Sequence, residues 1–183
     1  MDVALVNPLD IERICCFSGY RPEKLPWGYD EADPGCVRLR LALFQEICLL
    51  ARKGTARTFL CGMAMGVDLW CAAAVVAVKE LFPEWGVRLV AVLPYEGQAD
   101  AWPERVYLQY GTFRALADRE VVLAPHYRPG CMQRRDRFLV NHAATLLAVY
   151  DGQPGGTQYT VGYACRKNRR VLILDPATGK RTQ

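Results

Sequence analysis

Histidine is scarce in this chain, and the residue patterns of a metal centre are missing. Its 183 residues include two histidines, and none of the eight cysteines forms a C-x-x-C pair. Zinc sites are built from closely spaced cysteines and histidines, so we expect no metal site. No serine, histidine and aspartate arrangement or activated cysteine indicates nucleophilic catalysis, and no catalytic residue is assigned.

Long hydrophobic runs and a strong charge imbalance are also missing. No apolar run approaches the ~18–20 residues that span a bilayer, and no basic segment followed by an apolar core opens the chain. We therefore expect no membrane association and no secretion, but a cytoplasmic protein whose cysteines are small core residues. The net charge of +4 is mild and tolerates anionic ligands without demanding nucleic acid.

The composition that remains is typical of a folded domain. Hydrophobic residues make up 51% of the chain and charged residues 23%. A chain of this length fits a single domain, 1–183, whose core we expect from about residue 14 to about residue 174.

Short apolar runs alternate with helical patterns along the chain. Strands are predicted at 14–17, 58–61, 87–93, 120–123, 146–150 and 171–174, with helices between them. The first helix, 37–52, has one apolar face formed by Val37, Leu41, Phe44, Cys48 and Ala51. Such strands indicate an α/β, Rossmann-like fold, a mainly parallel sheet with helices on both faces. Ligands of these sheets bind beyond the carboxyl ends of the strands, at a topological switch point.

The most informative loop follows the second strand, where residues 61–70 read CGMAMGVDLW. Gly62 lets the backbone turn close to a ligand, and Gly66 supplies a conformation that a Cβ disfavours. The helix that follows offers free N–H groups and the positive end of its dipole to an anion. Asp68 caps this helix or accepts a hydrogen bond from a ligand hydroxyl. We expect a nucleotide-type site here, and an ordinary strand-to-helix turn is the alternative.

A second glycine loop repeats this arrangement after the strand 146–150. Gly155 and Gly156 free the backbone, and Thr157 caps the next helix or donates its hydroxyl to a phosphate. Two such loops favour a phosphate-bearing ligand over a surface loop with a threonine cap.

Three other segments end near the same expected edge. After the first strand, Ser18 can hydrogen-bond an anion and Arg21 can neutralise it, although a surface arginine beside a turn fits equally well. Tyr20 can stack on a base. Pro94 and Glu96 can form a wall of the site. Four arginines cluster around the fourth helix, mostly on a solvated face, with one or two near the site: Arg128, Arg134, Arg135 and Arg137.

The ligand-binding residues that we expect from these segments are Ser18, Gly19, Tyr20, Arg21, Gly62, Met63, Ala64, Gly66, Asp68, Pro94, Glu96, Arg135, Asp151, Gly152, Gly155, Gly156 and Thr157.

These motifs resemble the YpsA-like family of the SLOG superfamily. Its members are Rossmann-like proteins grouped with DNA-processing protein A and the lonely-guy enzymes. The resemblance covers about residues 14–174 and rests on SGYRP at 18–22, CGMAMGVDLW at 61–70, residues 135–141, DG at 151–152 and GGT at 155–157. It implies glycine loops that hold a nucleotide or an ADP-ribose-like ligand, with no certain cofactor.

One departure from this pattern bears on activity. The lonely-guy motif P-G-G-x-G-T-x-x-E carries a glutamate that serves hydrolysis of an N-glycosidic bond, but here Thr160 stands three residues after Thr157. We therefore favour binding or sensing over turnover. A nucleoside-phosphate N-glycosidase and a single-stranded DNA binder are the alternatives. Without a basic stripe with interleaved aromatics, the expected partner is a small nucleotide-type ligand and not a nucleic acid. A homo-oligomer is compatible with these features.

Overall fold

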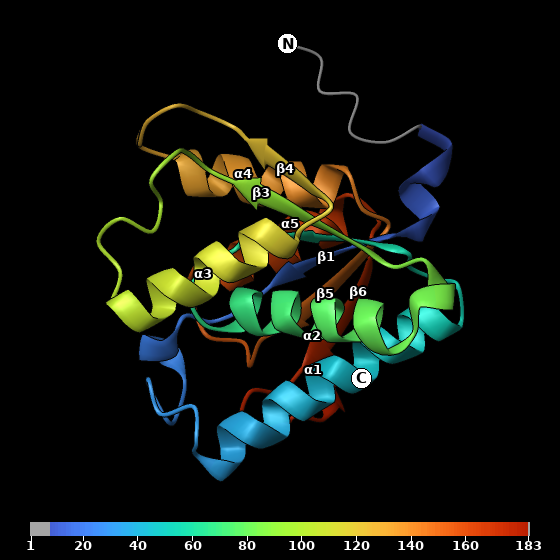
Figure 1. Ribbon diagram of the computed structural model, residues 1–183, viewed down its shortest axis with the longest axis horizontal. Helices are drawn as coiled ribbons and strands as arrows, with labels where there is room; N and C mark the ends of the chain where they lie inside the picture. The colour runs from blue at the N-terminus through green and yellow to red at the C-terminus, as the bar shows by residue number, and fades with distance from the viewer. Residues whose placement is uncertain (1–7, 183) are drawn as a thin grey trace.

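A seven-stranded sheet forms the centre of the computed structural model, which describes residues 8–182 (Figure 1). The strand order is β4-β3-β2-β1-β5-β6-β7. The strands are β1 (Ile14–Ser18), β2 (Thr58–Cys61), β3 (Arg88–Leu93), β4 (Arg119–Val122), β5 (Thr145–Val149), β6 (Arg170–Leu174) and β7 (Arg181–Thr182). The first six are parallel, and β7 pairs with β6 in the antiparallel direction. The predicted α/β Rossmann-like fold is confirmed.

Helices cover both faces of this sheet. They are α1 (Pro34–Arg52), α2 (Val67–Leu81), α3 (Glu104–Leu116), α4 (Cys131–Asn141) and α5 (Gly156–Arg166). Short 3₁₀ turns lie at η1 (Pro8–Arg13), η2 (Pro22–Lys24) and η3 (Pro83–Trp85). Helices α1, α2 and α3 pack on one face and α4 and α5 on the other, and each face has its own apolar core. None of the described helices is long and apolar enough to cross a membrane.

The strands are buried because both of their faces are apolar. In β1, Cys15 and Phe17 point into the core beneath α1 and α2, while Ile14 and Cys16 point into the core beneath α4 and α5. This alternation follows from the two-residue period of a strand. A run with no polar face is therefore stable only in the middle of a covered sheet.

Helix α1 is rotated relative to the apolar face read in the sequence: Ala51 of that face is buried and Phe44 and Cys48 pack partly buried against the core, but its first two residues face away. Val37 and Leu41 are 51% and 54% exposed. The buried row is Leu39, Leu43, Ile47 and Leu50. Both rows have helical spacing, because α1 is apolar over much of its circumference. The row that packs on the sheet and on α2 is therefore set by tertiary contacts that periodicity does not contain.

The chain reverses direction across the sheet at β1. Strand β2 pairs with one side of β1 and β5 with the other, so that Cys16 lies beside both Leu60 and Leu146. The loops that follow β1 and β5 diverge toward opposite faces, which leaves a crevice at the carboxyl ends of the strands. The glycine loops after β1, β2 and β5 all reach this crevice.

Candidate functional site

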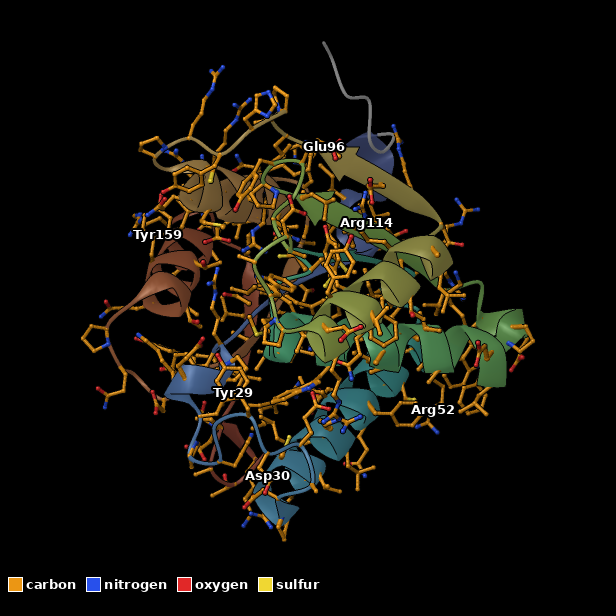
Figure 2. All side chains as sticks on the ribbon, turned by 60° about the vertical axis from the view of Figure 1, so that its left-hand side comes forward. Tyr29, Asp30, Arg52, Glu96, Arg114 and Tyr159 are labelled. Carbon is orange, nitrogen blue, oxygen red and sulfur yellow. The ribbon has the colours of Figure 1, made fainter. Side chains whose placement is uncertain are left out.

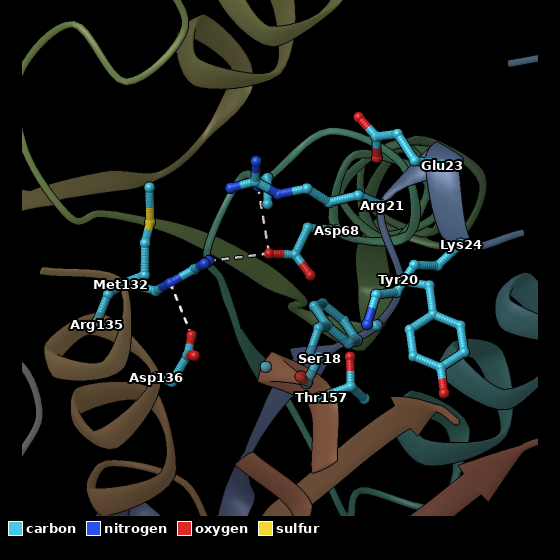
Figure 3. Close-up of a pocket in the computed structure, with 14 residues that line it drawn as sticks. Ser18, Tyr20, Arg21, Glu23, Lys24, Asp68, Met132, Arg135, Asp136 and Thr157 are labelled. Carbon is cyan, nitrogen blue, oxygen red and sulfur yellow. Dashed lines mark hydrogen bonds and ion pairs between the residues drawn. The ribbon is translucent and has the colours of Figure 1, made fainter. Parts of the chain in front are cut away.

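A cavity of about 280 Å³ lies at this switch point (Figure 3). We call it the switch-point cavity. Its walls come from the end of β1 and the turn η2, the loop between β2 and α2, one face of α4, and the start of α5. The lining residues are Phe17, Ser18, Gly19, Tyr20, Arg21, Glu23, Lys24, Ala64, Asp68, Met132, Arg135, Asp136, Gly156 and Thr157.

One wall of the cavity is built around Arg135, which is 7% exposed. Its Nη1 lies 3.0 Å from Oδ2 of Asp68, and its Nε lies 3.0 Å from Oδ1 of Asp136, as Figure 3 shows. Asp68 also accepts a hydrogen bond from the amide of Ala64 at 3.3 Å. A buried charge requires such partners, because an unpaired one costs several kcal/mol, on the order of 3–5. The guanidinium thus ties α2 to α4.

Burial shapes the protonation of this cluster. It raises the pKa of the Asp68 and Asp136 carboxyls above the ordinary value, and the charge of Arg135 opposes this shift only in part. Burial also disfavours the charged form of Arg135, but the two carboxylates outweigh it and the pKa of Arg135 is raised. The cavity therefore holds carboxyl groups that bind a proton more readily than exposed ones do.

Gly62 is required by the position of Arg135. A Cβ at residue 62 would overlap the guanidinium of Arg135 and would approach Oδ2 of Asp68 to 2.8 Å. The side chain from α4 reaches Asp68 only by lying directly against the backbone of the loop after β2. The first glycine of this loop thus makes room for a side chain of the protein itself.

The opposite wall has the character of an anion site. Helix α5 begins at Gly156 after Gly155, and no side chain caps it. The amide of Tyr159 donates a hydrogen bond to the carbonyl of Gly155 at 3.0 Å. The amides that precede it in α5 belong to the first helical turn, where the helix itself offers no carbonyl to accept their hydrogen bonds. Thr157, Gly156 and Ser18 line the cavity together with the cations of Lys24 and Arg21. Free amides, a hydroxyl and cations are the groups that bind phosphate at helix N-termini.

Two contacts tie the loop before α5 to the segment after β1. The hydroxyl of Tyr20 donates a short hydrogen bond to Oδ1 of Asp151, and Nζ of Lys24 donates to the carbonyl of Pro154 at 2.8 Å. The amide of Gln153 also donates to Asp151 at 3.1 Å. Burial, together with the bond to Asp151, raises the pKa of Tyr20 to about 12, so its hydroxyl keeps its proton. Tyr20 is 3% exposed, which leaves its ring as a wall and not as an open stacking platform.

The structure brings nine of the expected residues to the switch-point cavity: Ser18, Gly19, Tyr20, Arg21, Ala64, Asp68, Arg135, Gly156 and Thr157. Gly62 lies behind Arg135, Asp151 holds Tyr20, and Gly155 precedes α5. Gly152 is an exposed glycine of the same loop. Met63 is fully buried, and its carbonyl accepts a bond from Nε2 of Gln98 at 3.2 Å.

Three more expected residues lie farther from this cavity: Pro94, Glu96 and Gly66. Pro94 and Glu96 follow β3. The amide of Glu96 donates a hydrogen bond to the carbonyl of Ala124, which follows β4. This bond directs the loop away from the switch point, and Figure 2 shows Glu96 on the β4 side of the molecule, far from Tyr29. Gly66 lines a different cavity, described below.

Five lining residues were absent from the sequence-based set: Phe17, Glu23, Lys24, Met132 and Asp136. The signal for two of them was present. Met132 lies three residues before Arg135 and four before Asp136, a spacing that places side chains on one helix face, so Arg135 pointed to Met132 and Met132 in turn to Asp136. Lys24 reaches the cavity from the turn η2, which no strand-end pattern predicts. Among the described residues, no group of three histidine, cysteine or acidic side chains could hold a metal ion.

Comparison with known proteins gives a family and a fold. Residues 15–172 match the model of the YspA SLOG family, YpsA. The chain is 24% identical over 161 residues to the YpsA protein of Bacillus subtilis (strain 168), covering 86% of this chain and 87% of that protein. Among solved structures, DNA processing protein A from Helicobacter pylori has a TM-score of 0.58 at 13% identity, and that from Streptococcus pneumoniae 0.52 at 16%. Each alignment covers 91% of this chain, but 66% and 52% of the neighbours, so the chain spans about half the length of the second.

These neighbours correct one expectation. The structure of the Helicobacter pylori protein concerns its mode of single-stranded DNA binding. The sequence-based expectation that nucleic acid is not a partner is therefore wrong, because it rested on a mild net charge and on the lack of a basic stripe. Neither property separates this chain from a fold that includes DNA-binding proteins.

Proposed function

The chain belongs to the YspA SLOG family, and we propose that it binds a nucleotide or a nucleotide-derived, ADP-ribose-like ligand in the switch-point cavity. The observation that carries this proposal is the uncapped start of α5, with Thr157 in its first turn. It lies at the switch-point cavity together with Ser18 and Lys24. A phosphate group matches these donors in charge and in hydrogen bonding.

The Arg135 cluster supports the sugar end of the same ligand. Because Arg135 already faces Asp68 and Asp136, its charge is balanced within the protein. The remaining lone pairs of these carboxylates can accept hydrogen bonds from ribose hydroxyls, the role that acidic residues have in other nucleotide-binding sheets. The cavity then binds phosphate at α5 and sugar at α4.

Calorimetric titration with AMP, ATP, NAD and ADP-ribose tests this proposal. Thr157→Val removes a hydroxyl at nearly constant volume, and Lys24→Gln removes a cation. A hydrogen bond to a charged group contributes about 1.5–3 kcal/mol, so each variant should weaken the binding about tenfold or more. Thr112→Val, an exposed threonine of α3, is the matched control. Equal affinity of Thr157→Val, Lys24→Gln and wild type would remove α5 from the site.

Single-stranded DNA binding is the second candidate, favoured by the Helicobacter pylori neighbour, which binds single-stranded DNA, and by the exposed Arg134 and Arg137 of α4. A strand that crosses these arginines displaces counterions, so log affinity should fall with log salt by ~0.7 per phosphate neutralised. Steep salt dependence that is reduced in the Arg134→Gln, Arg137→Gln variant would assign the site to a strand. If wild type and this double variant both bind a mononucleotide with little dependence on salt, the site would be assigned to a small ligand.

A further inference from the structure

A second cavity, of about 290 Å³, lies beside the switch-point cavity. We call it the Trp70 cavity. Its walls are largely apolar and include Pro22, Met65, Leu69, Trp70 and Val106. Gly66, Tyr29 and Gln109 also line it.

A thin ridge separates the two cavities. Arg21 and Ala64 line the switch-point cavity, whereas the next residues in the chain, Pro22 and Met65, line the Trp70 cavity. The two loops touch here, since a Cβ at Gly66 would lie 2.8 Å from the carbonyl oxygen of Tyr20. Gly66 has a φ of +88°, a conformation that favours glycine and lets the loops approach. The cavities are therefore the two sides of one pair of loops.

The chemistry of the Trp70 cavity fits a planar ring with N–H groups. Trp70 is 7% exposed, and its Nε1 donates to Oε1 of Glu31 at 2.9 Å. Glu31 also faces Arg105 at 3.2 Å, so its carboxylate is held in place at the wall. An aromatic and apolar wall binds the face of a ring, and a fixed carboxylate with the Gln109 amide binds the edge of a ring.

Size points to one ligand across both cavities. Pockets that enclose a whole organic ligand measure roughly 300–1,000 Å³, and each of these cavities lies just below that range. Together they fall well inside it. A phosphate and sugar in one cavity leave an aromatic base to be accommodated in the other.

We propose that the Trp70 cavity is the base-binding subsite of the same ligand, which crosses the ridge at Arg21. This inference rests on the proposed function and narrows it to a ligand that carries an aromatic base. In a nucleoside diphosphate the base is bonded directly to the sugar, so the ligand crosses the ridge between these two groups and the pyrophosphate extends from the sugar toward α5. The base packs on the Trp70 and Tyr29 side, and its amino edge faces Glu31.

Binding of three probes separates the two cavities: inorganic pyrophosphate, adenosine and ADP. In wild type, ADP should bind about tenfold or more tightly than pyrophosphate, the lower part of the range that base stacking on aromatic side chains gives. Adenosine should shift the NMR signal of the Trp70 indole N–H, which Trp70→Phe identifies. Val106→Trp and Gln109→Trp each fill the cavity and should bring ADP to the affinity of pyrophosphate, without weakening pyrophosphate itself. Leu108→Trp, at a position 61% exposed on the same helix, is the control.

Each outcome bears on one claim. If ADP and pyrophosphate bind equally and adenosine leaves the Trp70 signal unmoved, the base subsite is overturned and the proposed function stands. If pyrophosphate does not bind but adenosine still shifts Trp70, the proposed function fails and the base subsite stands. A Trp70 signal that changes with protein concentration alone would show a second copy in the cavity and would overturn the inference, as would no response to any probe.

Discussion

Arg135 determines the geometry of the site at the scale of single residues. One guanidinium forms ion pairs with Asp68 from α2 and with Asp136 from its own helix, and it lies against the bare backbone of Gly62. Each partner is required because the group is buried, where an unpaired charge is costly. Changes at any of these four residues should therefore act through the other three.

The tightest of these contacts predicts the effect of Gly62→Ala. The added methyl overlaps Arg135, so the guanidinium must move away from Asp68. Forcing a methyl into a packed interior costs about 1–3 kcal/mol of unfolding free energy. Urea unfolding measures it, with Gly111→Ala as control, because a Cβ there meets open space. Unchanged stability of Gly62→Ala would contradict the packing of Arg135.

Asp136 predicts a pH dependence of stability. The pKa of its carboxyl is raised on folding, chiefly by burial, so the folded protein binds this proton more tightly than the unfolded chain does. The stabilisation from this group is fully present below the unfolded pKa and is lost as pH rises through the folded pKa. The difference in unfolding free energy between wild type and Asp136→Asn should therefore fall as pH increases from about 4. A difference that increases over this range would mean that Arg135 outweighs burial.

At the scale of elements, the strands could be predicted but the contacts between loops could not. Buried parallel strands are apolar on both faces, which the sequence displays directly in residues 14–17 and 146–149. The loops after β1, β2 and β5 follow from the same pattern, because they begin where these strands end. Pro94 and Glu96 also follow a strand, but the hydrogen bond that the Glu96 amide donates to the Ala124 carbonyl turns their loop toward β4. Such a bond depends on three-dimensional neighbours and leaves no sequence signal.

The tie between two elements predicts the effect of Tyr20→Phe. This change removes the hydroxyl that holds Asp151 and leaves the apolar ring in its place. The amides of residues 151–157 should then exchange hydrogen faster, because local opening of the loop costs less free energy. Hydrogen-exchange mass spectrometry measures this, with Tyr107→Phe, at a 48% exposed position on α3, as the control. Equal exchange in this segment for Tyr20→Phe and wild type would show that the tie does not order the loop.

Helix α5 predicts how the protein treats its ligand. Thr160, one turn after Thr157, is 2% exposed and donates to the carbonyl of Gly156 at 2.9 Å. It supplies no carboxylate for hydrolysis of an N-glycosidic bond. Incubation with AMP should therefore release no adenine above background, as chromatography would report. Adenine release that Asp136→Asn abolishes would assign turnover to the Arg135 cluster instead.

At the scale of the whole molecule, the topology places every proposed contact at one end of the sheet. The reversal of strand order at β1 opens the switch-point cavity, and the loops after β1 and β2 then form the ridge beside the Trp70 cavity. Neither cavity depends on a single element. Sequence motifs therefore predict which end of the sheet holds the site, but they do not predict which residues line which of the two cavities.

The central claim is that the start of α5 binds the phosphate of a nucleotide. Titration of isotope-labelled protein with ADP, followed by amide NMR, tests it most directly. The account predicts that the amide signals of Gly156 and Thr157 shift in wild type, and that the same shifts in Lys24→Gln need about tenfold or more ADP. Signals at Gly156 and Thr157 that stay fixed while those of Arg134 and Arg137 move would contradict the account and place the ligand on the outer face of α4.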